Sequence, residues 1–261
     1  MRKAVILLLS FIMIASCSKI YRDKPVDKSR LLGEDYRLFQ DTPAWELAKA
    51  VWDNDISKID REVKKNPQLL NYQESLYGLS LLHTSSYRGQ FKSFKELLRL
   101  GANPNIYDSV DCRSPIIQCC LDFDDKTKYV AELIKYGANV NDVECGKGRN
   151  LQKTEFTPIA AAAGYSGNLR MVKLLVEKGA VINDNSDESI LGGAVIQGYY
   201  DIVLYLLQQG ADCNKILYRQ GMDVDNLTDI YMKDRIMVDK KLRASKEYPQ
   251  IIEIMRKRGC L

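Results

Sequence analysis

A nine-residue pattern occurs four times in the chain and constrains the fold more than any other feature. The pattern begins with two aliphatic residues, continues to Gly-Ala and ends on asparagine. The copies lie at residues 97–105, 133–141, 174–183 and 206–214, and the third is one residue longer than the others. A second pattern, a serine or threonine followed by aliphatic or small residues, precedes each copy at residues 80–83, 114–117, 157–160 and 189–192. Two patterns that recur in the same order predict one supersecondary unit stacked on its neighbours.

Each unit is predicted to contain two helices. Thr157 can cap the first helix, and Pro158 then occupies the first helical position, where its missing N–H costs nothing. Ala162 and Ala163 are small enough to let neighbouring helices approach closely. The glycine after each second helix supplies a left-handed C-cap.

The two patterns resemble the ankyrin repeat, a β-turn and two helices in about 33 residues. The starts at Ser80, Ser114, Thr157 and Ser189 are 34, 43 and 32 residues apart, and weaker copies occur at residues 42–48 and 248–259. The resemblance implies an all-α ankyrin-repeat solenoid of about six helix-turn-helix repeats with β-turn fingers. It would cover residues 42–261, with repeats starting near residues 42, 80, 114, 157, 189 and 228. The inner helix of the last repeat is expected around residues 229–242.

The first 17 residues have the organisation of a secretory signal peptide. Arg2 and Lys3 precede an apolar run over residues 4–15, in which Ser10 is the only polar residue. A helix of this length is too short to cross the hydrocarbon core of a bilayer. Residues 14–17, Ile-Ala-Ser-Cys, resemble the lipobox of bacterial lipoproteins, which implies cleavage before Cys17 and a lipid on its sulfur. The alternative is a plain signal peptide with an incidental cysteine.

Ser18 follows the predicted lipidation site. By resemblance to Gram-negative lipoprotein sorting, a serine here implies the outer membrane, with the mature domain facing the periplasm. Residues 18–41 are rich in charge and contain Pro25 and Gly33. We predict that this segment is a flexible tether.

The charge balance argues against a nucleic-acid-binding protein. Without residues 1–17, 36 basic residues face 34 acidic ones, which leaves a net charge of +2 and no concentrated basic surface. The single histidine, His83, occupies a position where ankyrin repeats use histidine to hydrogen-bond between adjacent turns. No pattern typical of a catalytic nucleophile or a phosphate-binding loop is found. We therefore expect a binding module, monomeric when free, that is not an enzyme and needs no cofactor or metal.

The departures from the repeat supply the candidates for partner binding. The connection at residues 142–156 is about ten residues longer than a standard finger, and insertions in repeat proteins often lie on the binding face. A tolerated surface insertion is the alternative. Tyr165, Tyr199 and Tyr200 fall between the two helices of their repeats, where side chains can reach the concave side. The candidates, chosen at fingers, fingertips and these tyrosines, are Tyr107, Asp108, Asp111, Lys147, Arg149, Lys153, Asp184, Asn185, Asp187, Tyr199, Tyr218 and Arg219.

Six cysteines follow Cys17, and they allow fifteen complete pairings. Cys119 and Cys120 occupy positions where the repeat expects paired alanines, and Cys213 replaces an aliphatic residue, so we expect small buried side chains at all three. Cys112 and Cys145 lie on successive fingers and could meet. We predict a disulfide between them.

The combination of lipobox and ankyrin repeats resembles periplasmic ankyrin lipoproteins that serve as immunity proteins against type VI secretion phospholipase effectors. The resemblance implies a partner that is a toxic phospholipase, blocked at the mouth of its active site. The alternative is a periplasmic scaffold that stabilises or assembles an envelope protein, for example in oxidative-stress defence.

Overall fold

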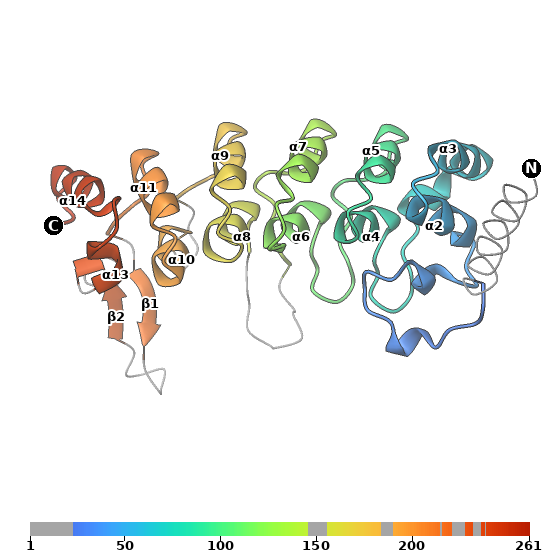
Figure 1. The fold of residues 1–261 in the computed structure, drawn as a ribbon, viewed down its shortest axis with the longest axis horizontal. Coiled ribbons are helices and arrows are strands. Elements are labelled where there is room, and N and C mark those ends of the chain that lie inside the picture. Colours follow the sequence, from blue (N-terminus) through green and yellow to red (C-terminus); the bar gives the residue numbers. More distant parts are fainter. Residues whose placement is uncertain are drawn as a thin grey trace, which may run out of the picture.

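The computed structural model describes residues 23–145, 156–183, 190–214, 216–220, 228–231, 236–237 and 239–261. Helix pairs stand side by side in one elongated row, with connecting fingers projecting from one edge (Figure 1). None of the helices in the described part is both long and apolar enough to cross a membrane.

Within the described residues, each helix pair contains an inner and an outer helix. The inner helices are α2 (Trp45–Trp52), α4 (Leu81–Tyr87), α6 (Pro115–Leu121), α8 (Pro158–Gly164), α10 (Ile190–Gln197) and α13 (Lys240–Arg243). The outer helices are α3 (Ile56–Lys65), α5 (Phe91–Arg99), α7 (Thr127–Lys135), α9 (Leu169–Glu177), α11 (Tyr200–Gln208) and α14 (Tyr248–Lys257). The 3-10 turns are η1 (Lys28–Arg30), η2 (Tyr36–Phe39) and η3 (Pro67–Asn71). The predicted solenoid of helix pairs is confirmed.

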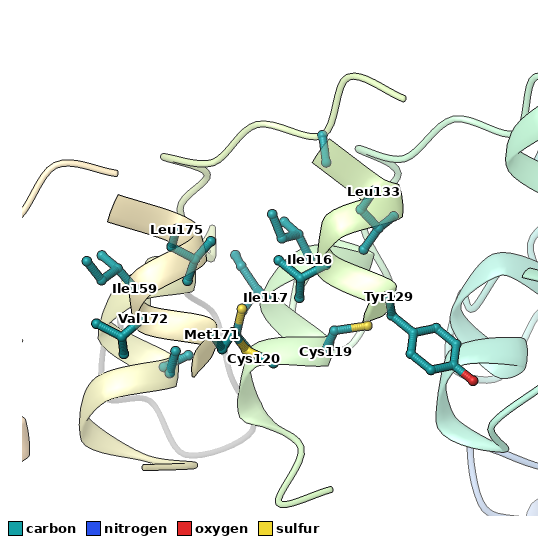
Figure 2. Packing of buried hydrophobic residues seen from close by; sticks show 14 of the residues in the cluster. Ile116, Ile117, Cys119, Cys120, Tyr129, Leu133, Ile159, Met171, Val172 and Leu175 are labelled. Atoms are coloured by element: carbon teal, nitrogen blue, oxygen red, sulfur yellow. The ribbon is translucent and has the colours of Figure 1, made fainter. Parts of the chain in front are cut away.

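The hydrophobic core runs continuously between neighbouring repeats. Cys120 of α6 lies beside Met171 of the next repeat, and both side chains are buried, as are Ile116 and Ile159 in the same cluster (Figure 2). Cys119 and Cys120 are free buried thiols, as predicted. Because each repeat covers its apolar face with its neighbour, a repeat taken out of the row would lose much of its core.

Small residues set the distance between α8 and α10. A Cβ added to Gly164 would lie 3.1 Å from the Cα of Gly193. Backbone therefore meets backbone at this crossing. A larger side chain at either glycine would have to push the two inner helices apart.

An asparagine ladder explains why the repeated pattern closes on asparagine. The side chain of Asn105 donates to the carbonyl of Gly137 (2.9 Å) and accepts from the amide of Asn139 (2.9 Å). The Asn141 side chain does the same one repeat further on: it donates to the carbonyl of Gly179 at 3.1 Å and accepts from the amide of Val181 at 2.8 Å. Asn183 repeats it again with Gly210 and Asp212. Each asparagine thus satisfies the C-terminal turn of the outer helix in the following repeat.

Replacing Asn141 by alanine should lower the free energy of unfolding by about 1–2 kcal/mol, because both hydrogen bonds to the next repeat are lost. Chemical denaturation measures the loss. Asn214→Ala is the matched control, because the Asn214 side chain has no hydrogen bond to the residues the structure describes. An equal loss in the two variants would contradict the ladder.

The N-terminal segment corrects the prediction of a tether. From residue 23 onward it is held against the first repeats. The Gln40 side chain accepts from the amide of Val26 at 3.1 Å and donates to the carbonyl of Lys24 at 2.9 Å, closing this part into a loop. The Tyr77 hydroxyl donates to the carbonyl of Leu31 at 2.8 Å.

Aromatic stacking fastens the same segment. Tyr36 stacks on Trp45 and on Trp52, with ring centroids 5.6 and 4.5 Å apart. Leu38 and Phe39 are buried in the core of the first repeats. The tether prediction is therefore wrong for residues 23–41. A few aromatic and aliphatic side chains in this otherwise polar segment pack on the first repeat and hold the segment in place. Residues 18–22 lie outside the described part.

The C-terminal repeat also differs from expectation. Strands β1 (Ile216–Gln220) and β2 (Thr228–Tyr231) form an antiparallel hairpin in place of a short finger. The predicted inner helix over residues 229–242 is therefore wrong at its start. Residues 229–231 belong to β2, whereas residues 236–237 are helical, and α13 begins at Lys240, where the Asp239 carboxylate caps it. The β-forming residues of these two segments favour strand pairing over a helix.

A second disulfide joins this end to the stack. Cys213, expected to be only a small buried residue, is bonded to Cys260, with their Cα atoms 6.1 Å apart. Arg258 donates to the carbonyl of Ala211 at 3.2 Å. The last two repeats are thus joined by a disulfide, whereas the earlier repeats are joined by asparagine hydrogen bonds.

Candidate partner-binding surface

A buried carboxylate organises the finger at residues 108–113. Asp108 Oδ1 accepts the amides of Val110, Asp111 and Cys112 at 2.8, 2.7 and 3.2 Å. Its Oδ2 accepts the amide of Arg113 at 3.1 Å. Asp108 is 8% exposed. This candidate for partner binding therefore stabilises the conformation of the finger and offers little surface to a partner.

The next finger is joined to the first by covalent and ionic contacts. Cys112 and Cys145 form a disulfide with a Cα–Cα distance of 5.3 Å. Arg113 Nε donates to the buried Glu144 carboxylate at 2.5 Å, and its Nη1 lies 3.3 Å from Asp111. These contacts restrain residues 108–113 and 142–145, which we call the finger wall, to one geometry.

Tyr107 adds a third connection between the fingers. Its hydroxyl donates to the Asp142 carboxylate, and its carbonyl accepts from the Gln73 side chain at 2.7 Å. The hydrogen bond to Asp142 raises the pKa of Tyr107 to about 12. The ring remains 38% exposed, so Tyr107 both links the fingers and offers part of its surface.

Tyr199, another candidate, is mainly a packing residue. Its hydroxyl donates to the carbonyl of Tyr165 at 3.3 Å. Its ring covers Gly167, where an added Cβ would lie 2.5 Å from the tyrosine Cζ. Gly167 has φ +65°, so the turn itself requires glycine.

Two groups of candidates have no described side chains. Tyr218 and Arg219 lie in β1, paired with Ile230 and Asp229 of β2. The remaining candidates lie outside the described residues: Lys147, Arg149, Lys153, Asp184, Asn185 and Asp187.

The structure brings together an apolar surface that the sequence analysis mostly missed. Four exposed side chains lie at or just after the C-terminal ends of successive inner helices: Tyr87 (41% exposed), Phe123 (75%), Tyr165 (46%) and Ile196 (48%). We call this set the apolar strip. Only Tyr165 was expected on the concave side. An apolar residue at the end of each first helix was the signal that could have revealed the others.

The rings of the strip cluster at its centre. The Phe123 and Tyr165 centroids are 5.3 Å apart, and Phe156 meets Tyr165 edge-on at 6.4 Å. Phe156 accepts the amide of Glu144, so the cluster adjoins the finger wall. Burial, followed by the charges of Asp108 and Asp111, raises the pKa of Tyr87 to about 12, while Arg113 acts in the opposite direction. Tyr87 and the aromatic cluster therefore both lie near the finger wall.

The loop that carries Phe123 is anchored on both sides. Lys126 is buried, donates to the carbonyl of Ser86 at 2.9 Å and lies 3.4 Å from the Asp122 carboxylate. Asp125 binds Arg170 at 2.8 Å. Phe123 is thus held in an exposed position before any partner arrives, which lowers the entropic cost of binding.

His83 serves the fold. Its Nδ1 accepts the amide of Ser80 at 3.2 Å, so Nε2 carries the proton and donates to the carbonyl of Arg113 at 3.3 Å. Within the described part of the chain, no group of three His, Cys, Asp or Glu residues could hold a metal ion. The described surface offers contacts for a partner rather than a set of reacting groups.

A row of helix pairs with projecting fingers and one exposed apolar strip defines a repeat solenoid of the protein-binding class. A family model for ankyrin repeats, in three copies, matches residues 143–216, and a single ankyrin repeat matches residues 77–109. The chain therefore contains ankyrin repeats, and its fold is an ankyrin-repeat solenoid. Ankyrin repeats are protein–protein interaction modules and typically not enzymes, which assigns the same general role to this chain.

Proposed function

We propose that the apolar strip and the finger wall together form the surface that binds a protein partner. The observation that carries this proposal is the exposure of four large apolar side chains at the same end of four consecutive inner helices. Large apolar side chains scattered singly over a surface need no explanation. Here they recur at the same position in four consecutive repeats, and Phe123 and Tyr165 are in contact, which supports an interaction site. Tyrosine and tryptophan also supply much of the binding energy in protein interfaces.

We further propose that the partner is a toxic phospholipase effector of a type VI secretion system and that this chain is its immunity protein. Two features support the proposal: the ankyrin stack and the lipobox-like end of the N-terminal segment. The finger wall adjoins the aromatic cluster through the hydrogen bond from Glu144 to Phe156, and we propose that the edge of the partner's active-site mouth docks against both. A bound solenoid would then block access of phospholipid to that mouth.

The location follows from the same N-terminal sequence. We propose that Cys17 carries lipid and holds the chain at the periplasmic face of the outer membrane. The two disulfides support an oxidising compartment, because disulfides persist there and are rare in the cytosol. Metabolic labelling with palmitate tests the anchor: label is expected on the wild type and none on Cys17→Ala.

The immunity proposal is tested with a phospholipase effector encoded beside this chain. Excess chain is expected to stop phospholipid hydrolysis and to co-purify with the enzyme. A Phe123→Ala/Tyr165→Ala variant should weaken binding by about 10- to 100-fold, because two exposed central rings are truncated.

Val181→Ala is the matched control for this experiment, since Val181 is 50% exposed and lies outside the strip. It should inhibit as well as the wild type. Hydrolysis rates that stay unchanged with excess chain would rule out the immunity role. Co-purification with an envelope protein, without any effect on phospholipase, would instead favour the scaffold.

A further inference from the structure

Carboxylates surround the central part of the apolar strip. The finger wall contributes Asp108, Asp111, Asp142 and Glu144, and the Phe123 loop contributes Asp122, Asp124 and Asp125. Among the described residues, three cations pair with these groups: Arg113, Lys126 and Arg170. These ten described residues carry a net charge of −4, and Lys147, Arg149 and Lys153 of the same connection lie outside the described part.

Much of this negative charge cannot move away. Asp108, Asp142 and Glu144 are buried, at 8%, 4% and 2% exposure, and each accepts at least one hydrogen bond from a neighbouring residue, whereas Asp142 Oδ2 accepts none from the described residues. A buried carboxylate is screened by salt less than an exposed one. The raised pKa of Tyr87, to which Asp108 and Asp111 contribute after burial, is consistent with a persistent negative potential beside the strip.

Two of the carboxylates remain accessible to a partner. Asp111 keeps 35% of its side chain exposed while it pairs with Arg113. Asp124 is exposed, directly follows Phe123, and forms no ion pair with the residues that the structure describes. Asp111 lies on the finger wall and Asp124 on the Phe123 loop.

Exposed aromatic faces bordered by carboxylates are suited to cations. An aromatic ring attracts a guanidinium or an ammonium over its face, and a carboxylate nearby adds a charge-assisted hydrogen bond. The molecule uses this contact elsewhere: Arg88 lies over Trp52 at 5.2 Å, and Lys128 lies over Phe91 at 4.7 Å. The rings of Phe123 and Tyr165 carry no such cation from the described residues.

We propose that the central part of the apolar strip receives a cationic segment of the protein partner, with arginine or lysine side chains over the Phe123 and Tyr165 rings and against Asp111 and Asp124. The inference rests on the proposed function for its surface and adds the chemistry of the partner. The fixed negative charge disfavours an anionic partner or an anionic lipid surface at this place.

The probe for the test is a synthetic peptide of alternating arginine and leucine, compared with a peptide of alternating glutamate and leucine. Binding to the folded chain is measured by fluorescence anisotropy at about 0.15 M salt. The arginine peptide is expected to bind, and the glutamate peptide is not. Phe123→Ala/Tyr165→Ala and, separately, Asp111→Asn/Asp124→Asn should each weaken binding about tenfold.

Glu177→Gln is the matched control, because Glu177 is an exposed carboxylate on the outer helix α9, with 70% of its side chain accessible. It should bind the arginine peptide like the wild type. Equal binding of both peptides, equal binding by the Asp111→Asn/Asp124→Asn variant, or an equal loss in Glu177→Gln would overturn the inference. Vesicles of anionic lipid serve as a further probe in the absence of peptide, because the arginine peptide itself binds such vesicles. Binding of the chain to the vesicles that is lost in Phe123→Ala/Tyr165→Ala would also overturn the inference.

The result separates this inference from the immunity role. Peptide binding that depends on Phe123 and Asp124, together with unchanged phospholipase rates, would keep the cationic site and reject the immunity function. Inhibition of the phospholipase with no preference for the arginine peptide would do the reverse.

Discussion

Joint replacement of Cys213 and Cys260 by alanine is expected to lower the free energy of unfolding by about 4 kcal/mol. The bond closes a loop of 47 residues, and a loop of this length restricts the unfolded chain by about that amount in the chain-entropy description. The double variant is used because a single replacement would leave a free thiol. Chemical denaturation without reductant measures the effect.

The loss should be concentrated at the end of the stack. Helix α14 lies beside α11 (Figure 1), and its side chains Ile251 and Met255 are buried. Without the disulfide, the last repeat would still be held by these contacts, by the Arg258 hydrogen bond and by the hydrogen bond from Tyr200 to Asp239. Hydrogen exchange in α14 should therefore accelerate far more than exchange in α6.

A reductant provides the control for this prediction. Reduction should destabilise the wild type more than the double variant, because only the Cys112–Cys145 bond remains to be broken in the variant. A wild type and a double variant with the same free energy of unfolding under oxidising conditions would show that the bond does not close this loop in solution.

Lowering the pH from 7 to 4 should destabilise the fold by about 3 kcal/mol through His83 alone. Burial lowers the pKa of His83 from its ordinary 6.5 to about 4, although the nearby Asp108 charge and the Arg113 carbonyl act in the opposite direction. The unfolded state therefore binds a proton below pH 6.5 that the folded state refuses until about pH 4. Stability contributed by the neutral imidazole is fully present above pH 6.5 and is lost as the pH falls towards 4.

The variant His83→Gln isolates this effect, because no other histidine occurs in the chain. It removes the titration but also changes the cap of α4, so its stability at pH 7 is expected to be lower than that of the wild type. The gap between the two proteins should close as the pH falls from 6.5 to 4. A gap that stays constant over this window would contradict a buried neutral histidine. Lys49 and Lys58 lower the pKa of Glu46 from 4.5 to about 2, so the contribution of Glu46 is lost as the pH falls from about 4.5 towards 2, and equally in both proteins.

The helix pairs could be predicted from the sequence because each rests on a local signal. Thr157 caps α8, as the pattern indicates, by accepting the amide of Ala160. Glycines such as Gly137, with φ +90°, end the outer helices in a conformation that other residues rarely adopt. The asparagine at the end of each pattern was recognised, although its bonds to the next repeat became visible only in the structure.

The N-terminal segment and the last repeat could not be predicted in the same way. Tyr36 has no periodic partner in the sequence, and its position between Trp45 and Trp52 depends on how η2 meets α2. The pairing of Cys213 with Cys260 depends on α14 returning to α11 after the hairpin. Such contacts join residues far apart in the chain, and no local pattern encodes them.

The candidate site divides along the same line. The stack of ankyrin repeats is encoded locally, because capping, helix termination and the spacing of apolar residues recur in each unit. Which polar and aromatic residues are available to a partner depends instead on how the repeats pack. Asp108 is occupied by hydrogen bonds to the amides of its own finger, and Tyr199 packs over Gly167. Phe123 is exposed because Lys126 and Asp125 fix its loop to the neighbouring repeats. Exposure depends on what surrounds a side chain in space, and that is set by the packing of one repeat on the next.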